Sequence, residues 1–439
     1  MGARLNQTLS MAATFSAFLN VKTIDVLVVG GGVVGVTAAL ALQQRRLKVI
    51  LVDQQSVATG CSFGNAGVIA SSAFPFSAHY RMANLPATFL KPSSPAALNW
   101  TSAPRLLPWA IQYARATRPD IVRRDTSLLH ELCRDALHSY EQLLGIDLPP
   151  INRCGYLAVH LTPSELGEAT RLNSIRTSLG GAVRMVSGPD LVELEPAMDR
   201  LMAGATFFEG AAHVTDPAAF VTSLADVFVQ RGGLLRYNRI QSLESKGNGE
   251  VAVRGTREHY SPRAVVLATG VHTNQLLVGC GHHIPIAAER GYHLELDIEP
   301  GFIRRPTALP SLGVVLTPSQ RGLRIAGISH FGSPGLRARP KLLLYGLKRL
   351  RRLLPMLRPR PGFEPWTGER PTSPDSLPIV ERIPGHRSIF VSCGHGHLGL
   401  TLAAVTARVT ADMVMSISSD YSNQLSSQRF GLRKRDGNG

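Results

Sequence analysis

Short runs of apolar residues that end at glycine mark the chain at widely separated places. Residues 24–29 (IDVLVV), 264–268 (AVVLA) and 388–392 (SIFVS) each contain a nearly continuous apolar stretch, and each runs within a few residues into Gly30, Gly270 or Gly394. Such runs, without regular polar alternation, are typical of strands that are buried on both faces. We therefore expect all three runs to be strands of one sheet that is interrupted by long insertions.

The first run opens a strand, helix, strand pattern around a glycine-rich turn. The segment GGGVVG (30–35) is followed by a predicted helix at 36–45 and a second strand at 48–52, which ends at Asp53. In this pattern Gly30 permits a tight turn, Gly32 lets the backbone approach a pyrophosphate, and Gly35 lets helix and sheet pack closely. Asp53 is spaced to bind a ribose hydroxyl. The pattern predicts dinucleotide binding but does not choose between FAD and NAD(P).

Helical periodicity appears at residues 121–144 and again from Leu400 onward. The apolar stretch 398–417 contains Arg408 and Asp412, so we interpret it as a buried or amphipathic helix rather than a membrane span. Asp216 followed by Pro217 predicts the N-cap and first residue of another helix.

The formal net charge of the chain is +16, with basic residues spread through every region. The densest basic cluster adjoins a leucine stripe that predicts an amphipathic helix; the cluster is Lys348, Arg349, Arg351, Arg352, Arg358 and Arg360, and the stripe is Leu343, Leu347, Leu350 and Leu354. This basic face is either a solvated surface above a core stripe or a site for anionic lipid headgroups. It lacks interleaved aromatic residues, so we expect no nucleic-acid partner.

Five cysteines without a C-x-x-C pair favour a reducing compartment and no disulfide framework. Cys393, His395 and His397 alternate with glycine and lack an evident fourth ligand, so we expect no metal site. We expect a cytoplasmic protein, with the inner face of the cell membrane as an alternative location. Residues 1–22 and 419–439 are expected to be extensions, the latter a basic, mobile tail.

Five motifs together resemble the D-amino-acid oxidase superfamily of flavoproteins, and in particular the bacterial D-amino-acid dehydrogenases of the small-subunit type. They are GGGVVG (30–35), ATGCSFGNAG (58–67), VVLATG (265–270), WTGERPTSPDSLP (366–378) and GHGHLGLT (394–401). The resemblance implies an α/β fold, with a Rossmann-like FAD-binding domain and a discontinuous α+β substrate domain. The expected FAD-binding domain comprises 23–75, 191–279 and 362–418, and the expected substrate-binding domain comprises 76–190 and 280–361.

The resemblance also implies where FAD is bound. The implied cofactor-binding residues are Gly30, Gly32, Val34, Gly35, Asp53, Gln54, Ser62, Asn65, Ala66, Ile240, Ala268, Gly270, Gly396, Gly399, Leu400 and Thr401. Backbone N–H groups at the helix start near Gly399 would stabilise the anionic reduced ring. Relatives with covalent flavin carry a cysteine within the stretch equivalent to 366–375, and this chain has none there. We therefore expect FAD to be held non-covalently.

The implied catalytic residues are Arg370, which matches the arginine that binds the substrate carboxylate, and Tyr292 on the substrate-domain side. The implied reaction converts a D-amino acid through an imino acid to a 2-oxo acid and ammonia, with electrons passing to a quinone or another non-oxygen acceptor. Alternatives are an O₂-using oxidase of glycine, sarcosine or a D-amino acid, a D-hydroxyproline dehydrogenase, and a catalytically inactive flavoprotein scaffold. His330 and Glu381 depart from the family pattern: His330 leaves the substrate side chain open, and Glu381 implies a different turn after the PDSLP stretch.

Overall fold

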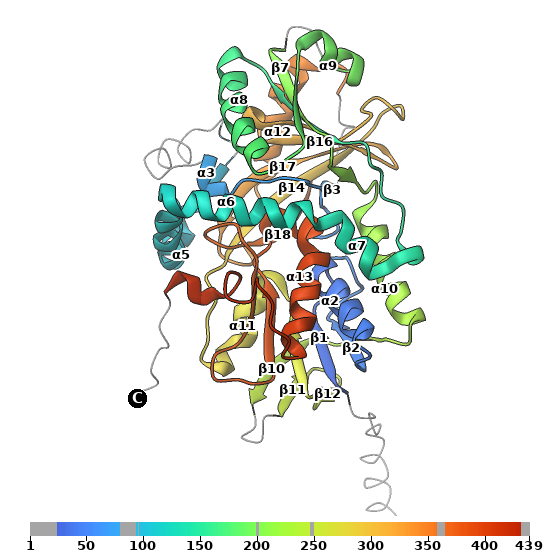
Figure 1. Cartoon of the computed structure of the whole chain (residues 1–439), viewed down its shortest axis with the longest axis vertical. Coiled ribbons are helices and arrows are strands. Elements are labelled where there is room, and N and C mark those ends of the chain that lie inside the picture. The colour runs from blue at the N-terminus through green and yellow to red at the C-terminus, as the bar shows by residue number, and fades with distance from the viewer. Residues whose placement is uncertain are drawn as a thin grey trace, which may run out of the picture.

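The computed structural model describes residues 24–79, 94, 96–198, 202–245, 250–357 and 365–431. Two large sheets organise these residues: a six-stranded sheet in the lower half of Figure 1 and a nine-stranded sheet in its upper half. Helices cover the lower sheet on the side that faces the viewer, where α13 and α2 lie side by side (Figure 1). The predicted extension at 1–22 lies outside the described residues.

The six-stranded sheet contains all three predicted apolar runs as neighbouring strands. Its order is β19 (Ile379–Arg382), β20 (Ile389–Cys393), β13 (Ala264–Leu267), β1 (Val26–Val29), β2 (Val49–Asp53) and β9 (Leu234–Tyr237). All neighbouring pairs are parallel except β19 with β20. Strand β1 is fully buried, as its unbroken apolar sequence predicts. The expectation of one sheet built from distant segments is confirmed.

Two helices bury the outer face of this sheet. Helix α2 (Val33–Gln44) follows the glycine turn directly, and α13 (Gly399–Val414) is the buried helix expected from the C-terminal apolar stretch. Helix α10 (Pro217–Gln230) packs on α2, and its predicted N-cap is present because Asp216 Oδ1 accepts hydrogen bonds of 3.0 Å from the N–H groups of Ala218 and Ala219. The Rossmann-like expectation is thus realised.

The nine-stranded sheet is assembled mainly from the two insertions. Its order is β18 (Trp366–Thr372), β14 (Ala287–Asp297), β17 (Gly322–Gly332), β16 (Val314–Ser319), β15 (Thr307–Leu309), β5 (Tyr156–His160), β7 (Gly204–Phe208) and β6 (Val183–Val186), while β4 (Ala96–Leu98) pairs with β17. Strands β7 and β18 belong to this sheet, although the expected boundaries put their residues with the FAD-binding segments. The two-domain division remains a prediction, with these two strands as exceptions.

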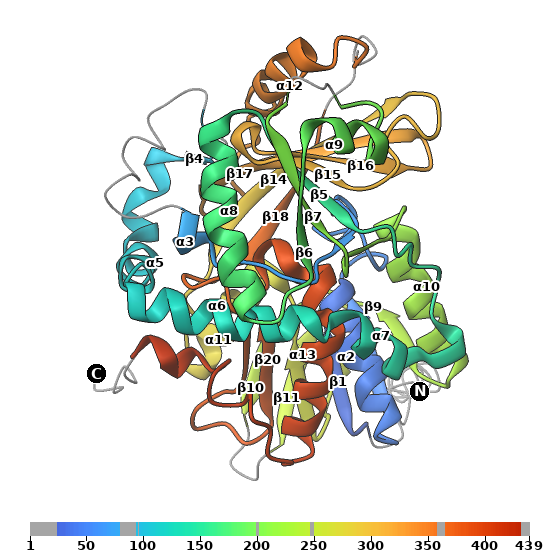
Figure 2. The same cartoon turned by 45° about the horizontal axis from the view of Figure 1, so that its top comes forward.

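Several helices surround this upper sheet (Figure 2). They are α5 (Ala103–Ala116), α8 (Pro163–Ser178), α9 (Gly188–Leu194) and α12 (Lys341–Leu353), whereas α6 (Pro119–Arg134) and α7 (Ala136–Leu144) pack on α13 of the lower half. The single helix expected at 121–144 is two helices, because the chain breaks at Asp135 between α6 and α7. In α12 the predicted leucine stripe is buried: Leu343, Leu347 and Leu350 all face the core. No helix among the described residues is long and apolar enough to cross a membrane.

Smaller elements complete the description. They are β3 (Val68–Ile69) paired with β8 (Ala212–His213), the sheet of β10 (Ile240–Ser245), β11 (Val251–Gly255) and β12 (His259–Tyr260), and the short helices α3 (Phe76–His79) and α11 (Thr273–Leu277).

The described part of the C-terminal segment is packed, which corrects the expectation of a mobile tail. Arg429 forms a two-pronged ion pair with Asp375, at 2.6 Å from Nε to Oδ2 and 3.0 Å from Nη2 to Oδ1. The Oγ atom of Ser427 donates to the buried Glu381 at 2.7 Å, and Leu425 is fully buried. Glu381, a departure from the family pattern, therefore anchors this segment to β19.

We predict that Arg429→Ala lowers the free energy of unfolding by about 3 kcal/mol, because it leaves a buried carboxylate unpaired. The Arg429 and Asp375 side chains are only 7% and 3% exposed. The matched control is Arg254→Ala. The side chains of Arg254 and its partner Glu244 are 60% and 53% exposed, so this substitution should lower the free energy of unfolding by less than about 1 kcal/mol. Urea unfolding of both variants tests this, and equal losses would contradict it.

Candidate functional site

The turn between β1 and α2 requires glycine at both of its close contacts. Gly30 has φ +115°, and a Cβ atom there would lie 2.4 Å from the carbonyl oxygen of Ala268 at the end of β13. A Cβ atom on Gly35 would lie 1.8 Å from the carbonyl oxygen of Gly30. No side chain can be accommodated at either distance. The turn therefore has the tight geometry that the sequence pattern predicted.

The N-terminus of α2 is open to an anion. No side chain caps this helix at Gly32, and the Val33 N–H donates to Ser62 Oγ at 3.0 Å. The first-turn N–H groups and the helix dipole therefore favour a phosphate at this end. Asp53 reaches the same turn, where its Oδ2 atom accepts a hydrogen bond of 2.5 Å from the N–H of Gly31. These features fit the pyrophosphate and ribose of a dinucleotide.

A cavity of about 880 Å³ begins at this turn and extends between the two large sheets. Most of the predicted site residues line it: Gly32, Val34, Ser62, Asn65, Ala66, Ala268, Gly270, Arg370, Gly396, Gly399, Leu400 and Thr401. Gly30, Gly35, Asp53, Gln54, Ile240 and Tyr292 are absent from its lining. The cavity therefore brings together the glycine-marked strand ends of β1, β13 and β20.

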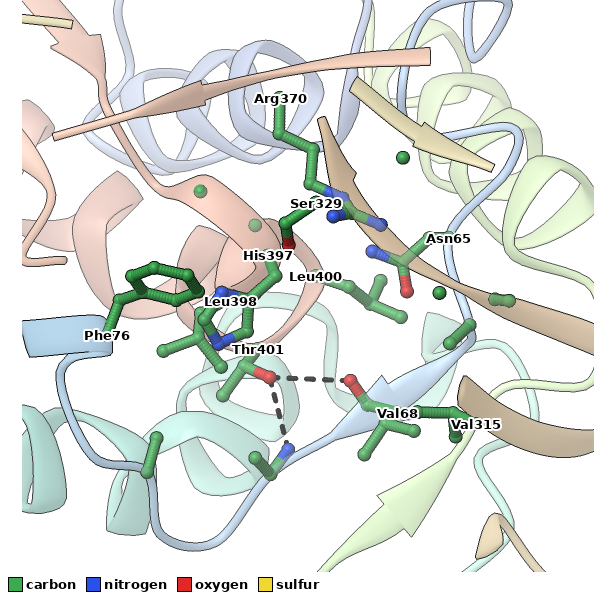
Figure 3. Close-up of a pocket in the computed structure, with 18 of the residues that line it drawn as sticks. Asn65, Val68, Phe76, Val315, Ser329, Arg370, His397, Leu398, Leu400 and Thr401 are labelled. Carbon is green, nitrogen blue, oxygen red and sulfur yellow. Dashed lines mark hydrogen bonds between the residues drawn. The ribbon is translucent and has the colours of Figure 1, made fainter. Parts of the chain in front are cut away.

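Two segments that are distant in sequence, residues 62–70 and the start of α13, are joined on the cavity wall. Thr401 Oγ1 accepts a hydrogen bond of 3.1 Å from the Ala70 N–H and lies 3.4 Å from the Val68 carbonyl oxygen (Figure 3). Asn65 Oδ1 accepts from the Gly67 N–H at 2.8 Å, which shapes the turn of the first loop. These contacts hold the segment 62–70 against the start of α13, so that both can contact one flat ligand.

Arg370 projects from β18 into the cavity, toward Asn65 and Ser329 in the view of Figure 3. Its Nη1 atom donates to Glu289 Oε1 at 2.9 Å. A Cβ atom on Gly291 would lie 2.1 Å from Arg370 Nη2, so the guanidinium lies across a strand position that only glycine leaves open. The guanidinium of Arg370 is thus held in place in the cavity by Glu289 and Gly291 on β14.

Glu289 is a buried carboxylate that the sequence analysis missed. Its two oxygens accept hydrogen bonds from Ser329 Oγ at 2.6 Å and from Thr372 Oγ1 at 2.7 Å, in addition to that from Arg370. Burial alone would raise its pKa, but the charge of Arg370, that of His397 when its ring is protonated, and the hydroxyl hydrogen bonds hold the pKa below its ordinary value. Glu289 is therefore ionised and fully hydrogen bonded.

A β-bulge presents Ser329 to this carboxylate. Arg290 and Tyr292 are two positions apart on β14. Their partners on β17, His330 and Gly327, are three positions apart. The extra residue falls at Ile328, which has φ +63°, a conformation that is rare for a β-branched side chain. Backbone strain of this kind is concentrated at functional sites.

Two further side chains in the cavity change its chemistry. His397 and Cys61 also line the cavity, and both are exposed in it. Desolvation by the surrounding walls lowers the pKa of His397, with Arg370 acting in the same direction and Glu289 opposing.

The structure corrects the prediction for Tyr292. Glu289 and Gly291 face the cavity, and strand alternation sends Tyr292 to the opposite face of β14, where it is 1% exposed. Its hydroxyl lies 2.9 Å from His330 Nδ1 and accepts from the Arg339 N–H at 3.0 Å. Burial lowers the pKa of His330 to about 4. Tyr292 is thus a core residue. A carboxylate directly after the apolar run 284–288 (IPIAA) was the signal for Glu289.

Comparison with known proteins agrees with this geometry. The sequence model of the family described as FAD dependent oxidoreductase (DAO) matches residues 25–413. A D-amino-acid oxidase of Bradyrhizobium diazoefficiens is 28% identical over 401 residues, which cover 89% of this chain and 94% of the relative. A D-amino acid dehydrogenase of Dechloromonas aromatica is 27% identical over 405 residues, which cover 89% of this chain and 96% of the relative.

A solved structure is similar over a comparable length. Glycine oxidase from Bacillus cereus superposes with a TM-score of 0.70 at 18% identity, covering 91% of this chain and 97% of the oxidase. At this identity the similarity shows the fold, which is the one expected from the sequence motifs.

We predict that Gly35→Ala abolishes retention of FAD, because the new methyl group would collide with the Gly30 carbonyl and open the turn. The matched control is Gly60→Ala, since a Cβ atom at Gly60 has no heavy atom within 4 Å. The ratio of flavin to protein absorbance after gel filtration measures the effect. An unchanged ratio in the Gly35 variant would show that the close contact is not needed.

Proposed function

The chain belongs to the FAD dependent oxidoreductase family, with FAD as its cofactor, and from this premise we propose that it oxidises a D-amino acid. The product is an imino acid, which water hydrolyses to a 2-oxo acid and ammonia. One observation carries the proposal: a guanidinium fixed by a buried carboxylate lines the same cavity as the predicted cofactor loops. A planar, two-pronged cation at this place suits an amino-acid carboxylate.

The cofactor-binding residues are proposed from the same geometry. Gly32, Val34 and the first turn of α2 would bind the pyrophosphate, and Asp53 would accept a hydrogen bond from the ribose. Asn65 and Ala66 on one loop, and the backbone of residues 399–401 on the other, would contact the flavin ring. Gln54 and Ile240 remain predicted contacts nearer the adenine. FAD, when bound, supplies the acceptor for the hydride that leaves the substrate Cα.

The proposed roles of the chain in the reaction are binding, orientation and proton handling. Arg370 binds the carboxylate and so directs the Cα–H bond, while Glu289 keeps the guanidinium from rotating. As the hydride leaves, the nitrogen lone pair forms the C=N bond, and the nitrogen then releases a proton. This requires a neutral amine. A ring nitrogen of His397, which lines the cavity, is the proposed acceptor for the proton that the substrate nitrogen releases.

We predict that Arg370→Ala retains FAD but loses at least about 100-fold in kcat/KM, because the carboxylate loses its charged, two-pronged partner. Arg370→Lys keeps the positive charge but loses the planar, two-pronged guanidinium, so its kcat/KM should lie between those of Arg370→Ala and the wild type. The exposed Arg382 on β19 gives the control variant Arg382→Ala. Steady-state kinetics with a D-amino acid measures the effect; near-normal kinetics of Arg370→Ala would exclude the carboxylate role.

The electron acceptor is proposed from an exposed surface. From Ser333 to Leu357 the chain contains no acidic residue, and α12 exposes Leu344 and Tyr345, 42% and 43% exposed, beside basic side chains. Helix α12 protrudes at the top of Figure 2, remote from the six-stranded sheet. Arg358 and Arg360 of the predicted cluster lie outside the described residues. We propose that this face rests on anionic lipid and that the acceptor is a membrane quinone.

We predict that the holoenzyme reduces a ubiquinone analogue faster in phosphatidylglycerol vesicles than in phosphatidylcholine vesicles, and that added salt removes the difference. The double variant Lys348→Glu/Arg352→Glu should lose this gain. A control with the same charge change is Arg105→Glu/Arg123→Glu, on exposed positions of α5 and α6. The alternative is an O₂-using oxidase, which one relative's name supports. Rapid turnover with O₂ alone and no lipid effect would favour that alternative.

A further inference from the structure

The cavity continues well beyond Arg370. Under the nine-stranded sheet it reaches β5, β7 and α8, where its wall is formed by Tyr156, Ala158, Ala169, Leu172, Arg176 and Phe208. We call this part the outer arm. Its wall is mainly apolar and aromatic. The proposed reaction uses none of these residues, so the outer arm needs an explanation of its own.

Arg176, in the last turn of α8, is the cation of the outer arm. Its guanidinium carbon lies 4.4 Å from the ring centroid of Phe74 and 5.0 Å from that of Phe208. Its Nη1 atom donates to Asn173 Oδ1 at 2.7 Å, but its Nε atom is buried without a hydrogen-bond acceptor. Among the residues that the structure describes, no carboxylate forms an ion pair with Arg176.

The two carboxylates that share this wall have other partners. Glu165 Oε2 accepts a hydrogen bond of 2.9 Å from the Leu161 N–H, and Glu168 forms a 2.6 Å ion pair with Arg171. Arg176 therefore differs from Arg370, whose charge is balanced by Glu289. Burial lowers the pKa of Arg176 to about 10, against a smaller, opposing effect of Tyr156.

A partly buried guanidinium that has no carboxylate partner among the described residues is costly, and an anion that enters the outer arm would lower that cost. The aromatic rings beside the guanidinium favour an anion attached to an apolar body. Both the substrate and the product of the proposed reaction fit this description, because each bears a carboxylate next to a side chain. We propose that Arg176 and the outer arm form a second binding site for small carboxylates.

This inference rests on the proposed function for the identity of the natural ligand, which is the incoming amino acid or the outgoing 2-oxo acid. The site lies on the same continuous cavity as Arg370, so a carboxylate can pass from one arginine to the other without leaving the protein. Loss of the outer site should then reduce capture of substrate more than the turnover of bound substrate. It should also weaken the dependence of capture on ionic strength.

The direct test is calorimetric titration of the FAD-loaded enzyme with benzoate, a carboxylate that cannot be oxidised by this reaction. We expect two sites in the wild type. Arg176→Gln should weaken one of them by at least about 10-fold, and Arg176→Lys by less, because a point charge remains. Arg370→Lys should weaken the other site. The control is Arg254→Gln, an exposed arginine on β11 outside the cavity lining, which should leave both sites intact.

Kinetics supply the second readout. With a D-amino acid, Arg176→Gln should raise KM by about 10-fold and change kcat by less than about 2-fold. Competition of benzoate with phenylpyruvate and, under anaerobic conditions, with D-phenylalanine then shows whether product or substrate occupies the outer site. Two unchanged benzoate sites in Arg176→Gln, or a single wild-type site that survives this substitution, would overturn the proposal.

Failure of the proposed function looks different. If no amino acid reduces the bound FAD, yet benzoate binding depends on Arg176, the oxidation proposal fails and the carboxylate site stands. If amino acids reduce FAD in the wild type and in Arg176→Gln with the same KM, the oxidation proposal stands and the proposal of a second carboxylate site fails.

Discussion

The ion pair between Arg370 and Glu289 is the interaction on which the site depends. A guanidinium placed alone in the cavity would be costly to desolvate, and a buried carboxylate more so. Together they balance, and the remaining acceptor positions of Glu289 are filled by Ser329 and Thr372. The pair joins β14 to β18, so the charge that would orient a substrate is also a contact between two strands of the upper sheet.

Glycine contacts shape the part of the cavity that adjoins the six-stranded sheet. Gly30 and Gly35 allow β1, α2 and the end of β13 to approach closely, and this puts the anion-binding end of α2 beside the loop that contains Asn65. The hydrogen bonds of Thr401 then join the start of α13 to the same loop. The predicted dinucleotide site and the proposed carboxylate site thus open into one cavity, an arrangement that suits hydride removal from an amino acid. Arg176 is a second guanidinium on the wall of this cavity, and unlike Arg370 it forms no ion pair with a carboxylate among the described residues.

Much of this could be predicted from the sequence where local pattern and chemistry coincide. The turn GGGVVG, the three buried strands and the N-cap at Asp216 follow from short-range rules. The cavity-facing side of β14 could not be predicted, because both faces of this strand are largely buried and its sequence shows no alternation that separates them. Tyr292 was therefore predicted at the site, although it faces the core. The packing of residues 425–430 and the position of Arg176 depend on partners far away in the sequence, Asp375 and Phe74 among them, which no local pattern reveals.

The central claim is that this chain transfers a hydride from an amino acid to FAD. Anaerobic mixing of the purified, FAD-loaded protein with a panel of D-amino acids, glycine and D-proline analogues tests it most directly, by the absorbance of oxidised flavin. The account predicts that at least one D-amino acid bleaches the flavin and that its L-enantiomer does not. Flavin that stays oxidised with every member of the panel, yet is bleached by dithionite, would contradict it.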